Sequence, residues 1–205
     1  MSQYFEIHAT NPQQRLIKQA VEIIHGGGVI VYPTDSSYAL GCHIGDKKAM
    51  DRLRRIRQID EKRNLTLVCK DLAEISTYAK VDNADYRLLK SLTPGPYTFI
   101  LKATNEVPRR LMHPKRRTIG IRVVDHPIVN ALLDELGQPI MSCTLILPGA
   151  ELPVTEAEDV RSILEHHVDL IIDGGHCGFE PTTVIRLTED QPIIRRQGKG
   201  QDHGL

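Results

Sequence analysis

The chain has 205 residues, of which 40% are hydrophobic and 25% charged, and its 26 basic residues balance 26 acidic ones. This length is enough to bury a full hydrophobic core, and it predicts a single domain over residues 1–205. Because the formal net charge is zero, composition supplies no overall field that would favour nucleic acid or a membrane surface as a partner.

Helices and strands are expected to alternate from the N-terminus onward. Apolar residues between 16 and 24 recur with helical spacing after Asn11-Pro12, a cap and first-turn pair, and the triple glycine at 26–28 ends that helix. An apolar strand at 29–32 follows, and Asp46 is placed to cap a second helix. The further elements expected in this half are a strand at 65–69, a helix at 82–92, a turn at 94–96 and a strand at 98–101.

The C-terminal half continues the alternation. A strand at 118–124 contains Arg122, and a helix at 127–136 has Asp125 or His126 near its N-cap and Gly137 at its end. The remaining expected elements are a strand at 139–144, a capped helix at about 155–167, a strand at 168–172, and two short strands at 182–187 and 192–195. Interleaved helices and strands predict the α/β class, and the short late strands make the sheet mixed rather than purely parallel.

Four widely spaced cysteines predict reduced thiols, because they form no C-x-x-C pair. Residues 1–10 contain neither a basic n-region nor an apolar h-region, and no apolar run is long enough to cross a bilayer. We therefore expect a cytoplasmic protein with no membrane partner.

Common cofactor and metal motifs are missing from the sequence. The triple glycine precedes a strand, whereas a dinucleotide fingerprint follows one, and neither G-x-x-x-x-G-K-[ST] nor G-x-S-x-G occurs. The spacing of His166, His167, His176 and Cys177 matches no common zinc arrangement. We therefore expect no structural metal.

Positive charge is concentrated in residues 47–63 and in residues 108–122, and the second segment contains no acidic residue. Guanidinium groups match phosphate oxygens in a bidentate way. For Arg52 and Arg54, however, a solvated helix face is the favoured interpretation. Arg122 differs, because an arginine among apolar residues needs an anionic partner, which is either a side chain such as Asp35 or a bound substrate.

Hydroxyl-rich segments follow two of the predicted strands. Thr34, Asp35 and Ser36 come directly after the strand at 29–32, and Ser142-Cys143-Thr144 ends the strand at 139–144. Ligands of open α/β sheets bind beyond the carboxyl ends of strands. The residues alone therefore predict an anionic or nucleotide-like ligand in a cationic cleft.

Seven motifs in order resemble the YrdC-like domain family, over roughly residues 12–200, and within that family they look closest to the YciO branch. The motifs are YPTDSSYALGC, a basic helix end, LTPGPYTFIL, GIRVVDHP, PIMSCT followed by PG, PTTVIRL and IIRRQG. The resemblance implies a single-domain YrdC-like fold, in which helices flank a twisted mixed sheet with a concave basic surface.

The resemblance also implies a function. Family members that are threonylcarbamoyl-AMP synthases join threonine, bicarbonate and ATP and release pyrophosphate, and their product feeds the threonylcarbamoyl modification of tRNA adenosine. The implied activity is weak synthesis or turnover of threonylcarbamoyl-AMP, with ATP and a divalent cation as substrate and no tightly bound cofactor. The alternative is binding of tRNA or double-stranded RNA without efficient catalysis, since the domain is associated with double-stranded RNA.

Two sets of site residues follow from the resemblance, without an assigned catalytic group. The substrate-binding set is Thr34, Asp35, Tyr38, Arg122 and Ser142. The set that binds nucleotide or phosphate is Arg55, Arg57, Lys62, Thr144 and Arg196.

The chain departs from the synthase pattern where phosphate is bound. Aligned without gaps, the K-x-R motif of synthases falls on Arg57 and Ile59, and S-x-N falls on Thr144 and Ile146. Loss of one such donor typically lowers a rate by about 10²–10³, so we expect inefficient synthesis. If Ile59 and Ile146 point into the core instead of the cleft, Arg55 with Arg57 becomes the equivalent of K-x-R.

Overall fold

The structure is a computed structural model that describes residues 1–60, 63 and 65–205. Lys62, expected to bind phosphate, lies outside the described residues. The strands are β1 (Gln3–Glu6), β2 (Ile30–Tyr32), β3 (Ala39–His43), β4 (Thr66–Val68), β5 (Tyr97–Lys102), β6 (Thr118–Arg122), β7 (Ile140–Thr144), β8 (Leu170–Asp173), β9 (Thr183–Arg186) and β10 (Ile193–Arg196). The helices are α1 (Gln14–His25), α2 (Lys47–Arg57), α3 (Leu72–Tyr78), α4 (Asn83–Leu92), α5 (Pro127–Leu136), α6 (Glu158–Leu164) and the 3-10 turn η1 (Arg109–Leu111).

Within the described residues the strands form a ten-stranded sheet in the order β1-β8-β2-β3-β7-β4-β6-β5-β9-β10. β8 runs parallel to β1 and β2, and the pairs β4–β6 and β5–β9 are also parallel. The remaining neighbours are antiparallel. The expected α/β class with a mixed sheet is therefore confirmed.

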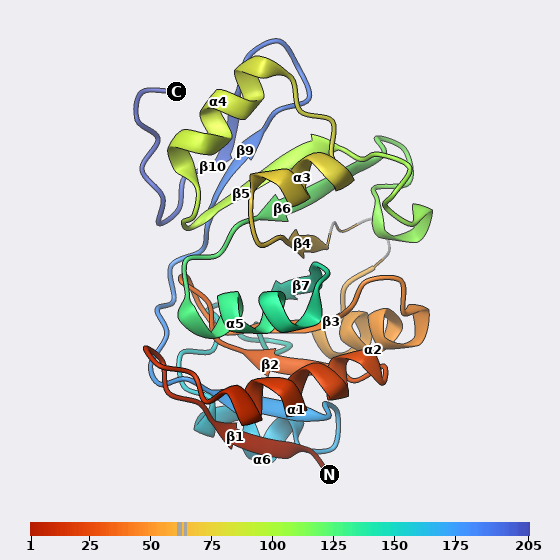
Figure 1. Cartoon of the computed structure of the whole chain (residues 1–205), viewed down its shortest axis with the longest axis vertical. Coiled ribbons are helices and arrows are strands. Elements are labelled where there is room, and N and C mark those ends of the chain that lie inside the picture. The colour runs from red at the N-terminus through yellow and green to blue at the C-terminus, as the bar shows by residue number, and fades with distance from the viewer. Residues whose placement is uncertain (61–62, 64) are drawn as a thin grey trace.

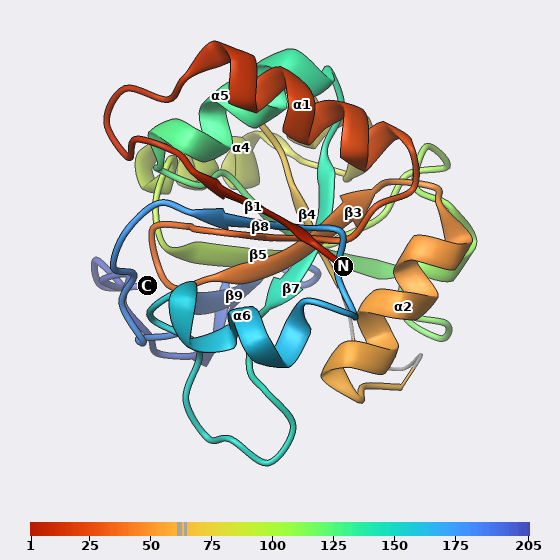
Figure 2. The ribbon, with the colours of Figure 1, turned by 90° about the horizontal axis from the view of Figure 1, so that it is seen from below.

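Helices cover the sheet on both sides. In the lower half of Figure 1, α1 and α5 lie together, and Figure 2 shows that α2 and α6 lie on the opposite side of the sheet. Ile17 and Ile24 of α1 pack with Ile128 and Leu132 of α5 in one buried cluster. A second cluster continues from α2 and α6 to strands β5 and β6 beneath α3 and α4. Each buried aliphatic side chain stabilises the fold by about 1.5–3 kcal/mol, so the sheet is fixed from both faces.

Two of the expected helix caps are confirmed. Asp46 accepts a hydrogen bond from the Ala49 backbone N at 2.9 Å, and His126 Nδ1 accepts one from Ile128 N at 3.1 Å. Burial lowers the pKa of His126, which keeps its ring neutral and able to accept. The cap expected at Asn11-Pro12 is wrong. The Asn11 backbone N donates to His8 Nδ1 at 3.1 Å, so Asn11 belongs to a separate turn before α1 begins.

Several elements were not expected from the sequence, namely β1, β3 and α3. All but the last residue of β3 are buried, so this strand lacks the alternation that normally marks a strand. The helix expected at 155–167 is shorter, since α6 spans Glu158–Leu164 and the Thr155 carbonyl accepts instead from Cys177 N at 2.9 Å. No helix in the described part of the chain is both long and apolar enough to span a membrane.

A first prediction concerns the end of α5. Gly137 has φ +72°, and a Cβ added at this position would have no atom within 4 Å, so an alanine there would meet backbone strain and no clash. We expect Gly137→Ala to lower the free energy of unfolding by about 1–2 kcal/mol in urea titrations. Gly26→Ala is the matched control, because Gly26 ends α1 with φ −76°. Equal effects of the two substitutions would contradict the strain argument.

Candidate functional site

Arg122, at the end of β6, is buried and forms an ion pair with Asp35. The other Asp35 oxygen accepts from the Asp125 backbone N at 2.9 Å. Of the two partners that the sequence left open for Arg122, the structure therefore shows the side chain of Asp35. The second terminal nitrogen of Arg122, Nη1, has Ser36 Oγ at 3.4 Å. This distance exceeds the usual range for a hydrogen bond, so Nη1 retains capacity to donate to a ligand.

The turn between β2 and β3 is closed by the hydroxyl of Thr34. Thr34 Oγ1 accepts from the backbone N of Ser36 and of Ser37, both at 3.1 Å, and donates to Ser37 O at 2.6 Å. Such local bonds stabilise turns formed by serine and threonine. This geometry holds the turn in place beside Arg122 and turns its residues toward the same face of the sheet.

The residues of this turn line one wall of a small cavity of about 40 Å³. The rest of its lining comes from six adjacent strands, β2-β3-β7-β4-β6-β5, and from Thr182 just before β9. The lining side chains other than those of the turn are Tyr32, Ala39, Thr66, Val68, Thr98, Arg122, Ser142, Cys143, Thr144 and Thr182. Most of these groups are hydroxyls, so the cavity offers neutral donors and acceptors around one cation.

Tyr32 and Ser142 join the two sides of the cavity through a hydrogen bond of 2.5 Å between their hydroxyls. Ser142 Oγ also donates to Leu40 O at 2.9 Å. Gly41 makes this approach feasible, because a Cβ there would lie 2.7 Å from the Tyr32 ring. The two hydroxyls thus form a fixed floor in which both polar groups are satisfied.

A cluster of arginines borders the cavity behind Cys143. Burial raises the pKa of the Cys143 thiol to about 12, against the opposing effect of Arg57, Arg54 and Arg63. Cys143 therefore stays a protonated thiol at neutral pH rather than a nucleophilic thiolate. Arg57 Nη1 donates to Ile146 O at 3.3 Å, and its Nε is buried without a partner among the described residues.

Arg196 connects this cluster with the cavity. Its guanidinium donates to Thr182 O, with Nη2 at 2.9 Å, and to Thr182 Oγ1 at 3.1 Å. Thr182 Oγ1 in turn lies 2.7 Å from Thr98 Oγ1. Burial, and then the charge of Arg63, lower the pKa of Arg196. Arg63 and Arg196 are thus close enough to repel each other, as expected where an anion would be held.

The structure brings Thr34, Arg122, Ser142 and Thr144 together as lining of the cavity, with Asp35 paired to Arg122. Tyr38 lies apart from the cavity, since its hydroxyl donates to Gly175 O at 2.6 Å and accepts from Gly174 N at 3.1 Å.

Arg55 does not reach the cavity that Arg57 approaches. Two residues along a helix are about 200° apart around its axis, and Arg55 lines pockets on the far side of α2. Ile59 packs against the core and lines one of these outer pockets. Ile146 offers its backbone oxygen to Arg57. The alternative pairing of Arg55 with Arg57 is therefore not supported by their positions, and Arg63, like Arg57, lies close enough to act on the Cys143 thiol.

Sequence reasoning missed several members of the site. Thr66, Thr98 and Thr182 were unassigned, because only the pairing of distant strands places them on one face. Arg54 was expected on a solvated helix face, and this was wrong. Its side chain is buried and donates to Asp60 O at 2.5 Å and Arg63 O at 3.2 Å, which orients the segment that carries Arg63.

No acidic side chain is among the described residues that line the cavity, and Asp35 beside it is paired with Arg122. Across residues 1–60, 63 and 65–205, no group of three His, Cys, Asp or Glu side chains gathers where a metal ion could bind. The four cysteines are free. The site is thus a neutral hydroxyl pocket joined to a cationic one.

Comparison with known proteins adds family relationships to this geometry. The family model Sua5_yciO_yrdC, described as "Telomere recombination", matches residues 22–198. The YciO protein of Escherichia coli strain K12 is 60% identical over 200 residues, covering 98% of this chain and 97% of that protein. The threonylcarbamoyl-AMP synthase of Photobacterium profundum is 27% identical over 183 residues, covering 88% and 98%.

Solved structures agree with these relationships. The crystal structure of E. coli YciO matches with a TM-score of 0.96 and 59% identity, covering 99% of this chain and 98% of the other. The structure of P. abyssi Sua5 complexed with L-threonine matches with a TM-score of 0.87 and 26% identity. That match covers 95% of this chain and 57% of the Sua5 chain.

A second prediction tests the buried ion pair. Asp35→Asn leaves the Arg122 charge buried without a counter-charge, and we expect the free energy of unfolding to fall by about 3–5 kcal/mol in urea titrations. Adding Arg122→Met removes that charge, so the double variant should lose less than the sum of the single changes. Glu189→Gln, which breaks an exposed pair with Arg186, is the control and should cost about 0–1 kcal/mol. Strict additivity of the two substitutions would contradict the coupling.

Proposed function

The chain belongs to the Sua5/YciO/YrdC family, and we propose that it binds a threonine-like ligand together with an adenylate. Its reaction is the slow synthesis or the breakdown of threonylcarbamoyl-AMP, in connection with the threonylcarbamoyladenosine modification of tRNA in the cytoplasm. The observation that carries this proposal is the junction at Thr182, where the hydroxyl cavity meets Arg196 and its neighbouring arginines.

The cavity suits the amino-acid end of such a ligand. Its volume of about 40 Å³ admits a small polar group such as a short side chain. Arg122 Nη1 retains donor capacity for a carboxylate. The Sua5 structure with L-threonine supports an amino acid as the ligand class for this fold.

The arginine cluster suits the phosphate end. An anion between Arg63 and Arg196 would relieve the repulsion that contributes to the lowered pKa of Arg196. The unpartnered Arg57 Nε provides a further donor. ATP with a divalent cation is proposed as a substrate, with no tightly bound cofactor. Because Ile146 contributes only a backbone oxygen, which already accepts from Arg57, we expect inefficient adenylyl transfer.

RNA binding without efficient catalysis is the second candidate, and one contact favours it. Arg110 Nη2 donates to Gly45 O at 2.5 Å, which brings the basic segment 109–117 beside the start of α2. Lys47 and Lys48 lie in the first turn of α2, while Lys115 and Arg116 are exposed. Two basic segments that are distant in the sequence thus share one surface, which is suited to the phosphates of tRNA or double-stranded RNA.

A third prediction tests the proposed reaction. Purified protein incubated with threonine, bicarbonate, ATP and a divalent cation should form threonylcarbamoyl-AMP slowly, or should consume that compound when it is supplied. Arg196→Ala removes a charge-assisted contact to phosphate, and we expect a rate about 10- to 100-fold lower. Arg87→Ala, on the exposed face of α4, is the charge-matched control. Absence of wild-type turnover in both assays would overturn the enzymatic proposal.

A fourth prediction tests RNA binding. Affinity for a short RNA duplex, measured by fluorescence anisotropy, should fall steeply with salt, because bound phosphates release counterions. The double variant Lys115→Ala, Arg116→Ala should reduce the slope of log affinity against log salt by about 2. Arg87→Ala with Lys90→Ala is the matched control, since both residues are exposed on α4. Binding that is independent of salt, or absent at about 50 mM salt, would count against this function.

A further inference from the structure

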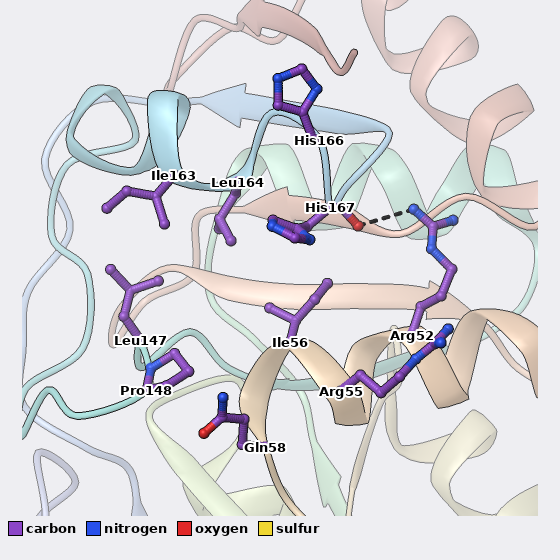
Figure 3. Close-up of a pocket in the computed structure, with 10 residues that line it drawn as sticks. All are labelled: Arg52, Arg55, Ile56, Gln58, Leu147, Pro148, Ile163, Leu164, His166 and His167. Carbon is purple, nitrogen blue, oxygen red and sulfur yellow. Dashed lines mark hydrogen bonds between the residues drawn. The ribbon is translucent and has the colours of Figure 1, made fainter.

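A second pocket lies between α2 and α6 and shares no lining residue with the central cavity. Its volume is about 530 Å³, within the range of about 300–1,000 Å³ that is usual for small-molecule sites. The floor is apolar, and the groups around it differ from one end to the other (Figure 3). This asymmetry is the starting point for identifying its ligand.

One end of the pocket is aliphatic. Leu147 and Pro148, from the loop after β7, face Ile163 of α6 across the opening, and Ile56 and Leu164 lie between them and the other end (Figure 3). Ile163 is 52% exposed, which is unusual for a large apolar side chain beside a cavity. An apolar ligand group seated here would remove this surface from water, at about 25 cal/mol per Å².

The other end is cationic. Arg52 is already engaged, since it donates to Asp169 at 2.8 Å and to His167 O at 3.0 Å. Arg55 lies beside it in Figure 3, and its side chain has no hydrogen bond or ion pair to any residue that the structure describes. Arg55 thus has donors available for an anion, and the neighbouring Arg52 adds to the positive field.

Gln58 supplies a polar group near the aliphatic end, at an energetic cost. It ends α2 with φ 54° and ψ 45°, the left-handed conformation that glycine adopts more readily. Non-glycine residues held in this conformation cost free energy and cluster at ligand-binding and active sites. The Gln58 amide lies on the same side of the pocket as Pro148 (Figure 3), where it can donate and accept hydrogen bonds.

We infer that this pocket binds a nucleoside monophosphate, with its base over the aliphatic floor and its phosphate on Arg55. A purely apolar ligand would leave the donors of the exposed Arg55 side chain unused, and a polyphosphate would leave the apolar floor uncovered. A flat base can use the aliphatic surface and the ring of His167, while its polar edge meets the Gln58 amide. The nucleotide is either free or an unpaired residue of single-stranded RNA.

Calorimetric titration with AMP tests this inference. The titrations use the variant Arg63→Ala, Arg196→Ala, in which the central arginine cluster is weakened, so that binding in the outer pocket is measured separately. We expect one AMP per chain. Adding Arg55→Ala should weaken AMP binding about 10- to 100-fold. Adenosine, which lacks the phosphate, should bind the variant that retains Arg55 with an affinity lower than that of AMP by a similar factor. Adding Arg87→Ala should have no effect.

Gln58→Gly provides a second, independent measurement. We expect it to raise the midpoint of thermal unfolding, because it relieves the left-handed strain, and to weaken AMP binding about 2- to 10-fold through the lost amide contact. A substitution that merely damaged the fold would lower both quantities. Single-stranded oligoadenylate is titrated in parallel, and sensitivity of its binding to Arg55→Ala identifies RNA as a source of the nucleotide.

The inference is overturned if AMP fails to bind the Arg63→Ala, Arg196→Ala variant while circular dichroism shows that the variant is folded. It is equally overturned if AMP binds and Arg55→Ala leaves the affinity unchanged. If the double variant is unfolded, Arg196→Ala alone is used with the same criteria. Failure of the central site to turn over threonylcarbamoyl-AMP would leave these outcomes unaffected, because the two sites share no residue.

Discussion

A buried guanidinium in the middle of the sheet is the constraint on which the surrounding loops depend. Arg122 is 7% exposed, and its charge requires a counter-charge that the turn after β2 supplies. Asp35 therefore has to enter the interior, and its second oxygen then holds the Asp125 backbone N that precedes α5. Lys199 Nζ donates to the backbone oxygen of Asp35 at 2.6 Å. Two segments that are distant from this turn in the sequence, residues 122–125 and the region of Lys199, thus converge on one aspartate.

The same constraint shapes the chemistry of the cavity. With Asp35 paired to Arg122, the remaining lining is dominated by hydroxyl groups that bind one another, as Tyr32 does with Ser142 and Thr98 with Thr182. These hydroxyl groups carry no charge, so they contribute little to the electrostatic attraction of an anionic ligand. That attraction comes from the arginines at the border of the cavity. In the proposed function, this division assigns recognition of a small polar group to shape and hydrogen bonds, and recognition of phosphate to charge.

The sequence predicts those parts of the fold and site that depend on local patterns. The caps at Asp46 and His126 and the strand that carries Arg122 are visible in it, since neighbouring residues determine each of them. The sequence does not determine the anionic partner of Arg122, because it does not show which distant carboxylate lies next to the guanidinium in the fold. The sequence also does not predict that Thr66 and Thr182 line the cavity, for a related reason. Their shared face depends on the register of β4 and β5 with strands far along the chain.

Helix α2 shows why composition hides the electrostatics of this protein. The chain has no net charge, yet the last turn of α2 carries Arg54, Arg55 and Arg57. Because successive residues are about 100° apart around a helix, these three side chains leave it in different directions. Arg54 turns inward to backbone oxygens, Arg57 approaches Cys143, and Arg55 lines the outer pocket. One short basic run thus makes a structural contact and supplies cations to two separate cavities, so the direction of each charge is decided by helical geometry rather than by the number of charges.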